Sequence, residues 1–212
     1  MGKINQGILG GFSGKVGTVV GGSWKGITYM RAKAVSVANP KTEAQLSQRA
    51  RFIVALRFLQ PCTDFLRIGY KNYAIKQTAF NAAMSYTLSN AITGTYPSFG
   101  IDHSKVMLSR GALTTAVNVQ AVVSGGAVKI SWDDNSSLGS AKPTDRALAI
   151  MVNPDNGEAV YDVAGATRSS GTELLNIPPD WTGDTVEVYL GFISEDGKEV
   201  ANSVYAGPVV VA

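Results

Sequence analysis

Apolar residues recur at every second position along most of the second half of the chain. The clearest runs are 117–123, 128–132, 148–152 and 186–192. A period of two sends successive side chains to opposite faces of a strand, so each run predicts a short β-strand with one buried face. Turn sequences rich in Gly, Asn, Asp and Pro separate the runs, at 124–126, 153–157 and 194–198. About seven short strands in roughly 110 residues predict an antiparallel β-sandwich over residues 104–212.

Helical periodicity replaces this alternation in residues 39–96. Apolar side chains recur there every three or four positions, which is the spacing of a buried helix face. Thr42 begins a capping sequence, Pro61 interrupts the pattern, and Gly94 supplies a C-terminal stop. The expected helices cover residues 42–60, 63–68 and 78–92. We therefore expect a small helical unit before the sandwich, which makes the chain a member of the α+β class.

Glycine dominates the N-terminal part of the chain. Nine of the first 26 residues are glycine, and each costs about 1 kcal/mol in a helix relative to alanine. Residues 1–38 are therefore predicted to form an extended, basic, glycine-rich arm. Phe12, Trp24 and other apolar residues lie between the glycines, so the arm is expected to lie against another surface. The alternative is a pair of short strands, for example Lys15–Val20 and Gly26–Arg31, packed on the chain's own core.

Charge is distributed unevenly along the chain. Residues 1–76 hold twelve of the 19 Lys and Arg residues but two of the 16 Asp and Glu residues. This part therefore carries a net charge of +10 and the remainder carries −7. Such a division predicts two parts with different partners.

The sandwich region resembles a fibronectin type III or immunoglobulin-like domain. Trp132 stands at an inward position of the second predicted strand, and the sequence 175–179 leads toward the strand that begins near Val186. The resemblance covers roughly residues 104–212. It implies a fold and no particular activity, because such sandwiches serve unrelated functions.

Four sequence segments together resemble an uncharacterised domain family of Bacteroidota and their phages. They are residues 10–21, 24–26, 39–52 and 203–205. The match spans most of the chain. Because that family is itself of unknown function, the resemblance implies a bacterial or phage origin and supplies no catalytic residues.

The sequence contains no convincing catalytic or metal-binding pattern. His103 is the only histidine and Cys62 the only cysteine, too few for a zinc site with three or four nitrogen and sulfur ligands. A Cys62–His103–Asp102 arrangement is formally available, but Cys62 lies near a helix start and His103 in a linker, which favours structural roles. We predict no catalytic, cofactor or metal residues, and no enzyme. Neither an export signal nor a stretch of about 18 apolar residues is present, so no membrane partner is expected.

The residues predicted to bind a partner all lie in the basic first part of the chain. They are Lys15, Trp24, Lys25, Tyr29, Arg31, Lys33, Arg49, Arg51 and Arg57. If the cations meet acidic protein surfaces, the chain is a non-enzymatic structural or assembly protein, which we expect in a phage or phage-like virion. Its partners would then be other copies of itself or other virion proteins, in the virion or the host cytoplasm. The alternative is a nucleic-acid-binding protein, in which the cations contact phosphates while Trp24 and Tyr29 stack on bases.

Overall fold

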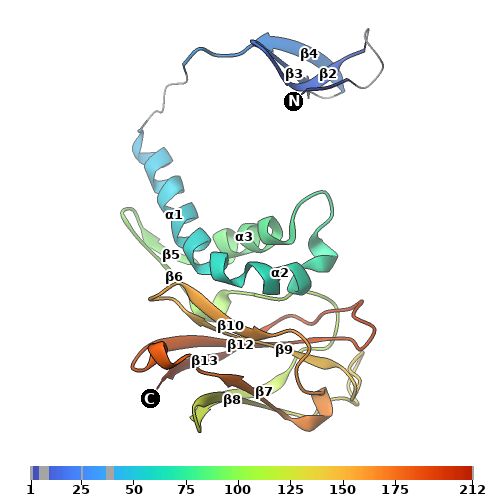
Figure 1. Cartoon of the computed structure of the whole chain (residues 1–212), viewed down its shortest axis with the longest axis vertical. Helices are drawn as coiled ribbons and strands as arrows, with labels where there is room; N and C mark the ends of the chain where they lie inside the picture. The colour runs from blue at the N-terminus through green and yellow to red at the C-terminus, as the bar shows by residue number, and fades with distance from the viewer. Residues whose placement is uncertain (1, 5–9, 25, 37–40, 212) are drawn as a thin grey trace. The chain divides into compact units, whose positions relative to one another are not determined.

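The structure is a computed structural model that describes residues 2–4, 10–24, 26–36 and 41–211. The chain divides into two compact units, Met1–Thr42 and Glu43–Ala212, and each is described by itself. The N-terminal unit contains strands, whereas the C-terminal unit contains helices and antiparallel strands (Figure 1). The α+β class is therefore confirmed.

The N-terminal unit is an antiparallel sheet with the strand order β1-β2-β3-β4. Its strands are β1 (Lys3–Ile4), β2 (Phe12–Val16), β3 (Val19–Trp24) and β4 (Ile27–Ala32). Val16 lies opposite Val19, so a two-residue turn joins β2 to β3. Gly17 in this turn has φ +58°, the left-handed conformation that tight hairpins require and glycine adopts without steric cost.

The prediction of an extended arm is therefore wrong for β2, β3 and β4. Its glycines do prevent a helix, but β-branched and aromatic residues between them, such as Val16, Val19 and Tyr29, favour strands. Gly21 also permits close packing, because a Cβ there would lie 2.2 Å from the Phe12 carbonyl oxygen. The alternative of short strands is correct in that strands form, although they begin and end at other residues. They belong to a compact unit of their own, so their predicted packing on the chain's own core is not confirmed. Lys25 lies outside the described residues.

Two antiparallel sheets form the lower layers of the C-terminal unit in Figure 1. One has the order β10-β9-β12-β13 and the other β11-β8-β7. The strands are β7 (Val117–Ser124), β8 (Ala127–Asp133), β9 (Arg146–Asn153), β10 (Glu158–Asp162), β11 (Thr172–Asn176), β12 (Thr185–Ile193) and β13 (Val204–Val210). The sheets enclose a core that contains Ile130 and Trp132 from β8, Met151 from β9 and Phe192 from β12. The inward position predicted for Trp132 is confirmed.

Helices cover the outer face of the four-stranded sheet (Figure 1). They are α1 (Glu43–Leu59), α2 (Thr63–Gly69) and α3 (Ala79–Asn90), and α3 leads into a hairpin of β5 (Ile92–Thr95) and β6 (Ser98–Ile101). Short 3₁₀ helices are η1 (Gln60–Cys62), η2 (Lys71–Tyr73), η3 (His103–Lys105), η4 (Arg168–Ser170) and η5 (Pro179–Trp181). The three predicted α-helices are thus confirmed to within a few residues. Within the described residues, no helix is both long and apolar enough to cross a membrane.

Strand β9 connects the two cores of this unit. Ala147, Ala149 and Met151 face the interior between the sheets, whereas Leu148 and Ile150 pack against the helices. The strand is therefore buried on both faces. The helices and the sandwich share this strand and belong to one compact unit, Glu43–Ala212. The boundary that the sequence predicted between residues 39–96 and 104–212 lies inside this unit.

A buried ion pair lies beside the inter-sheet core. Arg168 Nε is 3.1 Å from Asp145 Oδ2, and both side chains are completely inaccessible to solvent. The guanidinium also donates to Asn135 Oδ1 at 2.7 Å and to the Thr114 carbonyl at 2.9 Å, and it stacks 3.8 Å above the Phe192 ring. Burial lowers the pKa of this guanidinium from its ordinary value, and the nearby Asp145 carboxylate opposes that effect. The network fixes the loops before β9 and β11 to the sandwich.

Candidate interaction surface

Cys62, His103 and Asp102 are each engaged in separate contacts. Cys62 is buried, its thiol donates to a carbonyl of the preceding helical turn at 3.6 Å, and burial raises its pKa to about 12. His103 Nε2 lies 3.9 Å from Glu187 Oε1. Asp102 pairs with Lys105 at 2.9 Å. A buried, protonated thiol is a poor nucleophile, so the geometry favours the structural role predicted for Cys62.

Carboxylates that are adjacent in the sequence bind different partners. Asp133 accepts a hydrogen bond from Asn118 Nδ2 at 2.6 Å, whereas Asp134 accepts one from the Ser136 backbone N–H at 3.0 Å. In the part of the chain that the structure describes, no three His, Cys, Asp or Glu side chains gather into a group able to hold a metal ion.

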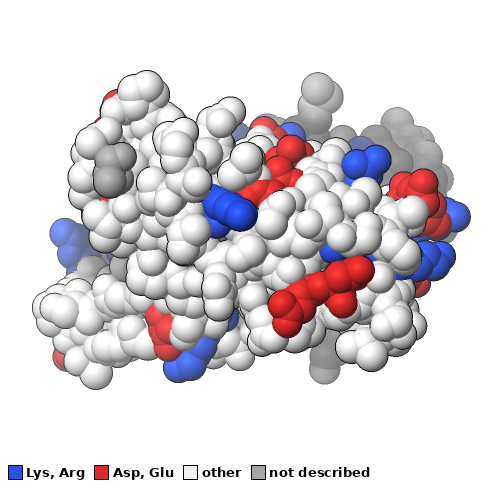
Figure 2. All heavy atoms as spheres, turned by 90° about the horizontal axis from the view of Figure 1, so that it is seen from below, with Lys and Arg blue, Asp and Glu red and all other residues white. Residues whose placement is uncertain are grey.

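The acidic side chains of the sandwich are dispersed on the side shown in Figure 2. This view looks from below Figure 1, where β7 and β8 lie, and its Asp and Glu residues form small groups separated by uncharged ones. The outer face of the three-stranded sheet carries Lys129 between Val122 and Leu174, which lie opposite it on the neighbouring strands. On the described surface in this view, the acidic residues therefore form no single patch.

The N-terminal sheet has almost no interior. Among the described residues of its unit, Gly21 alone is buried. Met30, Ile27 and Trp24 are 70%, 71% and 69% exposed. A small sheet needs a covered apolar face for stability in water, because a unit of this size buries too little surface on its own. Its exposed apolar side chains therefore indicate an interaction surface.

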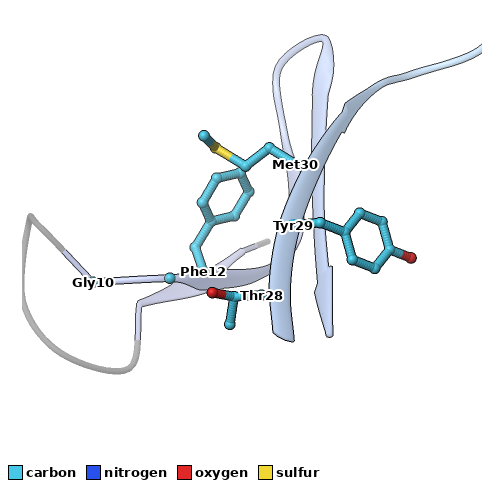
Figure 3. Close-up of a pocket in the computed structure, with 6 residues that line it drawn as sticks. Gly10, Phe12, Thr28, Tyr29 and Met30 are labelled. Atoms are coloured by element: carbon cyan, nitrogen blue, oxygen red, sulfur yellow. The ribbon is translucent and has the colours of Figure 1, made fainter. Parts of the chain in front are cut away.

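One side of this sheet is mainly apolar, with Ser23 and Thr28 as the polar pair on it. Residues directly opposite each other on neighbouring strands point to the same face, and the register pairs Val16 with Val19 and Gly21 with Met30. We define the apolar face by its nonpolar side chains, Phe12, Val16, Val19, Met30 and Ala32. Figure 3 shows Phe12 and Met30 on one side of the sheet and Tyr29 pointing to the other. A hollow lined by Gly10, Gly11, Phe12, Thr28, Tyr29 and Met30 opens beside them.

The opposite side carries the cations together with Trp24 and Tyr29. Lys15 lies opposite Val20, which in turn lies opposite Arg31. Tyr29 lies opposite Gly22, and a Cβ at Gly22 would be 3.0 Å from the tyrosine ring, so glycine permits the ring to lie over the strand. We define the basic face by its cationic and large apolar side chains, Lys3, Lys15, Trp24, Ile27, Tyr29 and Arg31.

The structure thus brings four of the predicted interaction residues together on one face, namely Lys15, Trp24, Tyr29 and Arg31. Lys33 follows directly after β4, and its backbone N–H donates to the Thr18 carbonyl at 2.7 Å.

The remaining predicted cations lie on α1 in the C-terminal unit. Arg49 and Arg57 are exposed, whereas Arg51 is half-buried and its Nη2 donates to the Leu88 carbonyl at 3.0 Å. Arg51 therefore ties α1 to α3. Sequence analysis did not identify the apolar face, because the face depends on the pairing of strands such as that of Val16 with Val19.

Comparison with known protein families gives a match that covers most of the chain. A family model described as "Family of unknown function (DUF6266)" matches residues 11–207. The chain belongs to this family. The DUF6266 match begins just before β2 and ends within β13, so it includes strands of both units. No curated protein and no solved structure matches the chain. The resemblance to a family of unknown function that the sequence indicated is confirmed at this level.

Proposed function

We propose that the chain is a non-enzymatic structural protein that joins an assembly through its N-terminal sheet. The observation that carries this proposal is the apolar face, where Met30 is 70% exposed and Val16 54% exposed, in a unit whose described residues include one buried residue, Gly21. Covering that face with a protein surface removes apolar area from water at about 25 cal/mol per Å². The sheet is therefore most stable when it is docked.

The C-terminal unit supports the same proposal because it carries its own cores. Residues such as Leu59, Phe65 and Ile150 are fully or almost fully buried, and a second cluster fills the space between the sheets. A body of this kind remains folded whether or not the N-terminal sheet is bound. The N-terminal unit thus suits docking, whereas the C-terminal unit supplies a sandwich that is stable by itself.

We assign the assembly to a phage or phage-like particle, with other copies of this chain or other virion proteins as partners. The support is the resemblance of the glycine-rich segment 10–21 and of the segment 39–52 to a domain family of Bacteroidota and their phages. The protein is accordingly expected in the virion or in the host cytoplasm.

We also infer that the sandwich is of the fibronectin type III kind. In constant-type immunoglobulin domains the fourth strand joins the sheet formed by the first, second and fifth strands. Here the corresponding sheet contains β7, β8 and β11, whereas β10 borders β9 on the other sheet. Trp132 on β8 packs edge-on against Phe192, with the ring centroids 5.5 Å apart. Both features support the fibronectin type III assignment.

Light scattering on the full chain tests the assembly proposal through a matched pair of variants. Val16 on the apolar face and Val122 on the outer face of the sandwich are both strand valines that are 54% exposed. A charge at position 16 opposes burial of the apolar face, whereas the same charge at position 122 leaves that face unchanged.

We expect the wild-type chain to form a defined oligomer whose mass persists at high salt, because an apolar contact is screened little by ions. Val16→Asp should return the chain to monomers, and Val122→Asp should keep the oligomer. A wild-type chain that stays monomeric at high concentration contradicts self-assembly through this face. Equal dissociation by both variants would also contradict it.

A further inference from the structure

The basic face of the N-terminal sheet presents cations and aromatic rings, so it suits a different kind of partner from the apolar face. Lys15 and Arg31 lie in one row across three strands, with Val20 between them. Neighbouring strands are about 4.8 Å apart, so the two cationic residues start about 10 Å from each other. They can contact separate phosphates of one chain.

Charge in this unit is of one sign. Residues 1–42 contain six Lys or Arg residues and no Asp or Glu. The six are Lys3, Lys15, Lys25, Arg31, Lys33 and Lys41. Because no carboxylate of this unit competes for them, the surface attracts a polyanion from solution.

Two aromatic rings lie on the same face as the cations. Trp24 is 69% exposed and lies opposite Ile27, while Tyr29 is 45% exposed and lies two residues further along β4. Diagonal neighbours of this kind are about 7–8 Å apart, which gives each ring room for its own stacking partner. Exposed rings beside cations are the combination that single-strand binders use, with phosphates on the cations and bases on the rings.

We propose that the basic face binds single-stranded nucleic acid, with phosphates on Lys15 and Arg31 and bases stacked on Trp24 and Tyr29. Single strands are favoured over duplexes because paired bases keep their faces inside the helical stack and cannot lie on these rings. This goes beyond the assembly function and concerns the opposite side of the sheet. A docked subunit can therefore keep its basic face open to a nucleic acid.

Tryptophan fluorescence reports on this contact directly. Of the three tryptophans, Trp132 and Trp181 are 5% and 0% exposed, whereas Trp24 is 69% exposed. The full chain is titrated with an oligothymidylate of roughly ten nucleotides, within the usual site size of single-strand binders. The comparison probes are a duplex of the same length and polyglutamate, an acidic chain without bases.

We expect the oligothymidylate to quench the exposed tryptophan and to bind more tightly than either comparison probe. The two phosphate contacts, on Lys15 and Arg31, predict a loss of about sevenfold in affinity between 50 and 200 mM salt. Tyr29→Leu should weaken binding by about fivefold or more, and Tyr29→Phe should retain it, because a phenyl ring still stacks. The conservative variant separates lost stacking from a damaged sheet.

The contribution of charge to binding is tested with one lysine variant on the basic face and one control variant on the sandwich. Lys15→Gln should weaken binding severalfold and lower the salt dependence by about one phosphate contact. Lys129→Gln, at an exposed strand position on the sandwich, should change neither. Lys15→Gln is also expected to keep the oligomer mass, so a failure here is distinguishable from a failure of the assembly proposal.

Three results would overturn the proposal. The first is no quenching at low salt. The second is equal binding of polyglutamate, which would assign the face to acidic protein surfaces. The third is equal binding of the duplex with no effect of Tyr29→Leu, which would leave a nonspecific attraction of polyanions.

Discussion

Replacing Arg168 with methionine should destabilise the C-terminal unit by about 3–5 kcal/mol. The side chain is completely buried and contributes the ion pair with Asp145 and the hydrogen bonds to Asn135 and Thr114. Methionine fills much of the volume and still contacts the Phe192 ring. The loss therefore comes mainly from the electrostatic contacts.

The magnitude follows from what the substitution leaves behind. Asp145 would keep the hydrogen bond from the Lys142 backbone N–H at 2.9 Å, but its carboxylate would stay buried without a counterion. Removing one partner of a buried ion pair typically costs about 3–5 kcal/mol. For a unit of this size each kcal/mol lowers the melting temperature by about 2–4 °C, so Arg168→Met should lower it by roughly 6–20 °C.

Urea denaturation followed by circular dichroism measures this free energy. The control is Arg146→Met, because Arg146 is exposed and its Nη1 lies 3.4 Å from the Gly165 carbonyl; we expect a change within about 0.5 kcal/mol. The double variant Arg168→Met/Asp145→Asn removes the unpaired charge and should recover at least about 1 kcal/mol relative to Arg168→Met. A loss below about 1 kcal/mol for Arg168→Met, or no recovery in the double variant, would refute the reasoning.

Three further predictions follow from single contacts. Burial raises the pKa of the Cys62 thiol to about 12, so this thiol should not react with a disulfide reagent at pH 8 until the chain unfolds. Because the folded state holds the thiol proton more tightly, the free energy of unfolding should fall as the pH rises above the ordinary thiol pKa of about 8.5. Rapid labelling of the native chain would contradict this burial. Thr78→Ala should cost about 1 kcal/mol in urea, because the Thr78 hydroxyl accepts from the Asn81 N–H at the start of α3 at 3.1 Å; an unchanged midpoint would count against the cap. Gly21→Ala places a Cβ 2.2 Å from the Phe12 carbonyl oxygen and should abolish the oligomer in light scattering, whereas an unchanged mass would show that β2 and β3 do not pack in this way.

The strands of the sandwich could be predicted because alternation is a local signal. Val128, Ile130 and Trp132 are the inward residues of β8, as their spacing indicates. Burial of β9 on both faces depends on helices more than fifty residues away in the sequence. The apolar run from Ala147 to Val152 is the sequence feature that reflects this burial. The shared core therefore could not be obtained from alternation alone.

The N-terminal sheet was harder to predict because the same glycines allow several conformations. Their density excludes a helix, but only the pairing of Lys15 with Val20 and of Val20 with Arg31 assigns the two cations to one face. A register is a pairing between strands and cannot be obtained from a single segment. The buried position of Arg168 was equally inaccessible, because arginine is rarely buried unless it is paired.

Hydrogen exchange over β2, β3 and β4 at increasing protein concentration tests most directly whether the N-terminal sheet is a docking element. The account predicts fast exchange in the dilute monomer and protection that rises with the oligomer fraction, while β9 exchanges slowly at every concentration. Slow exchange of the N-terminal strands in the dilute monomer would show that the sheet is stable without a partner, and would contradict the account.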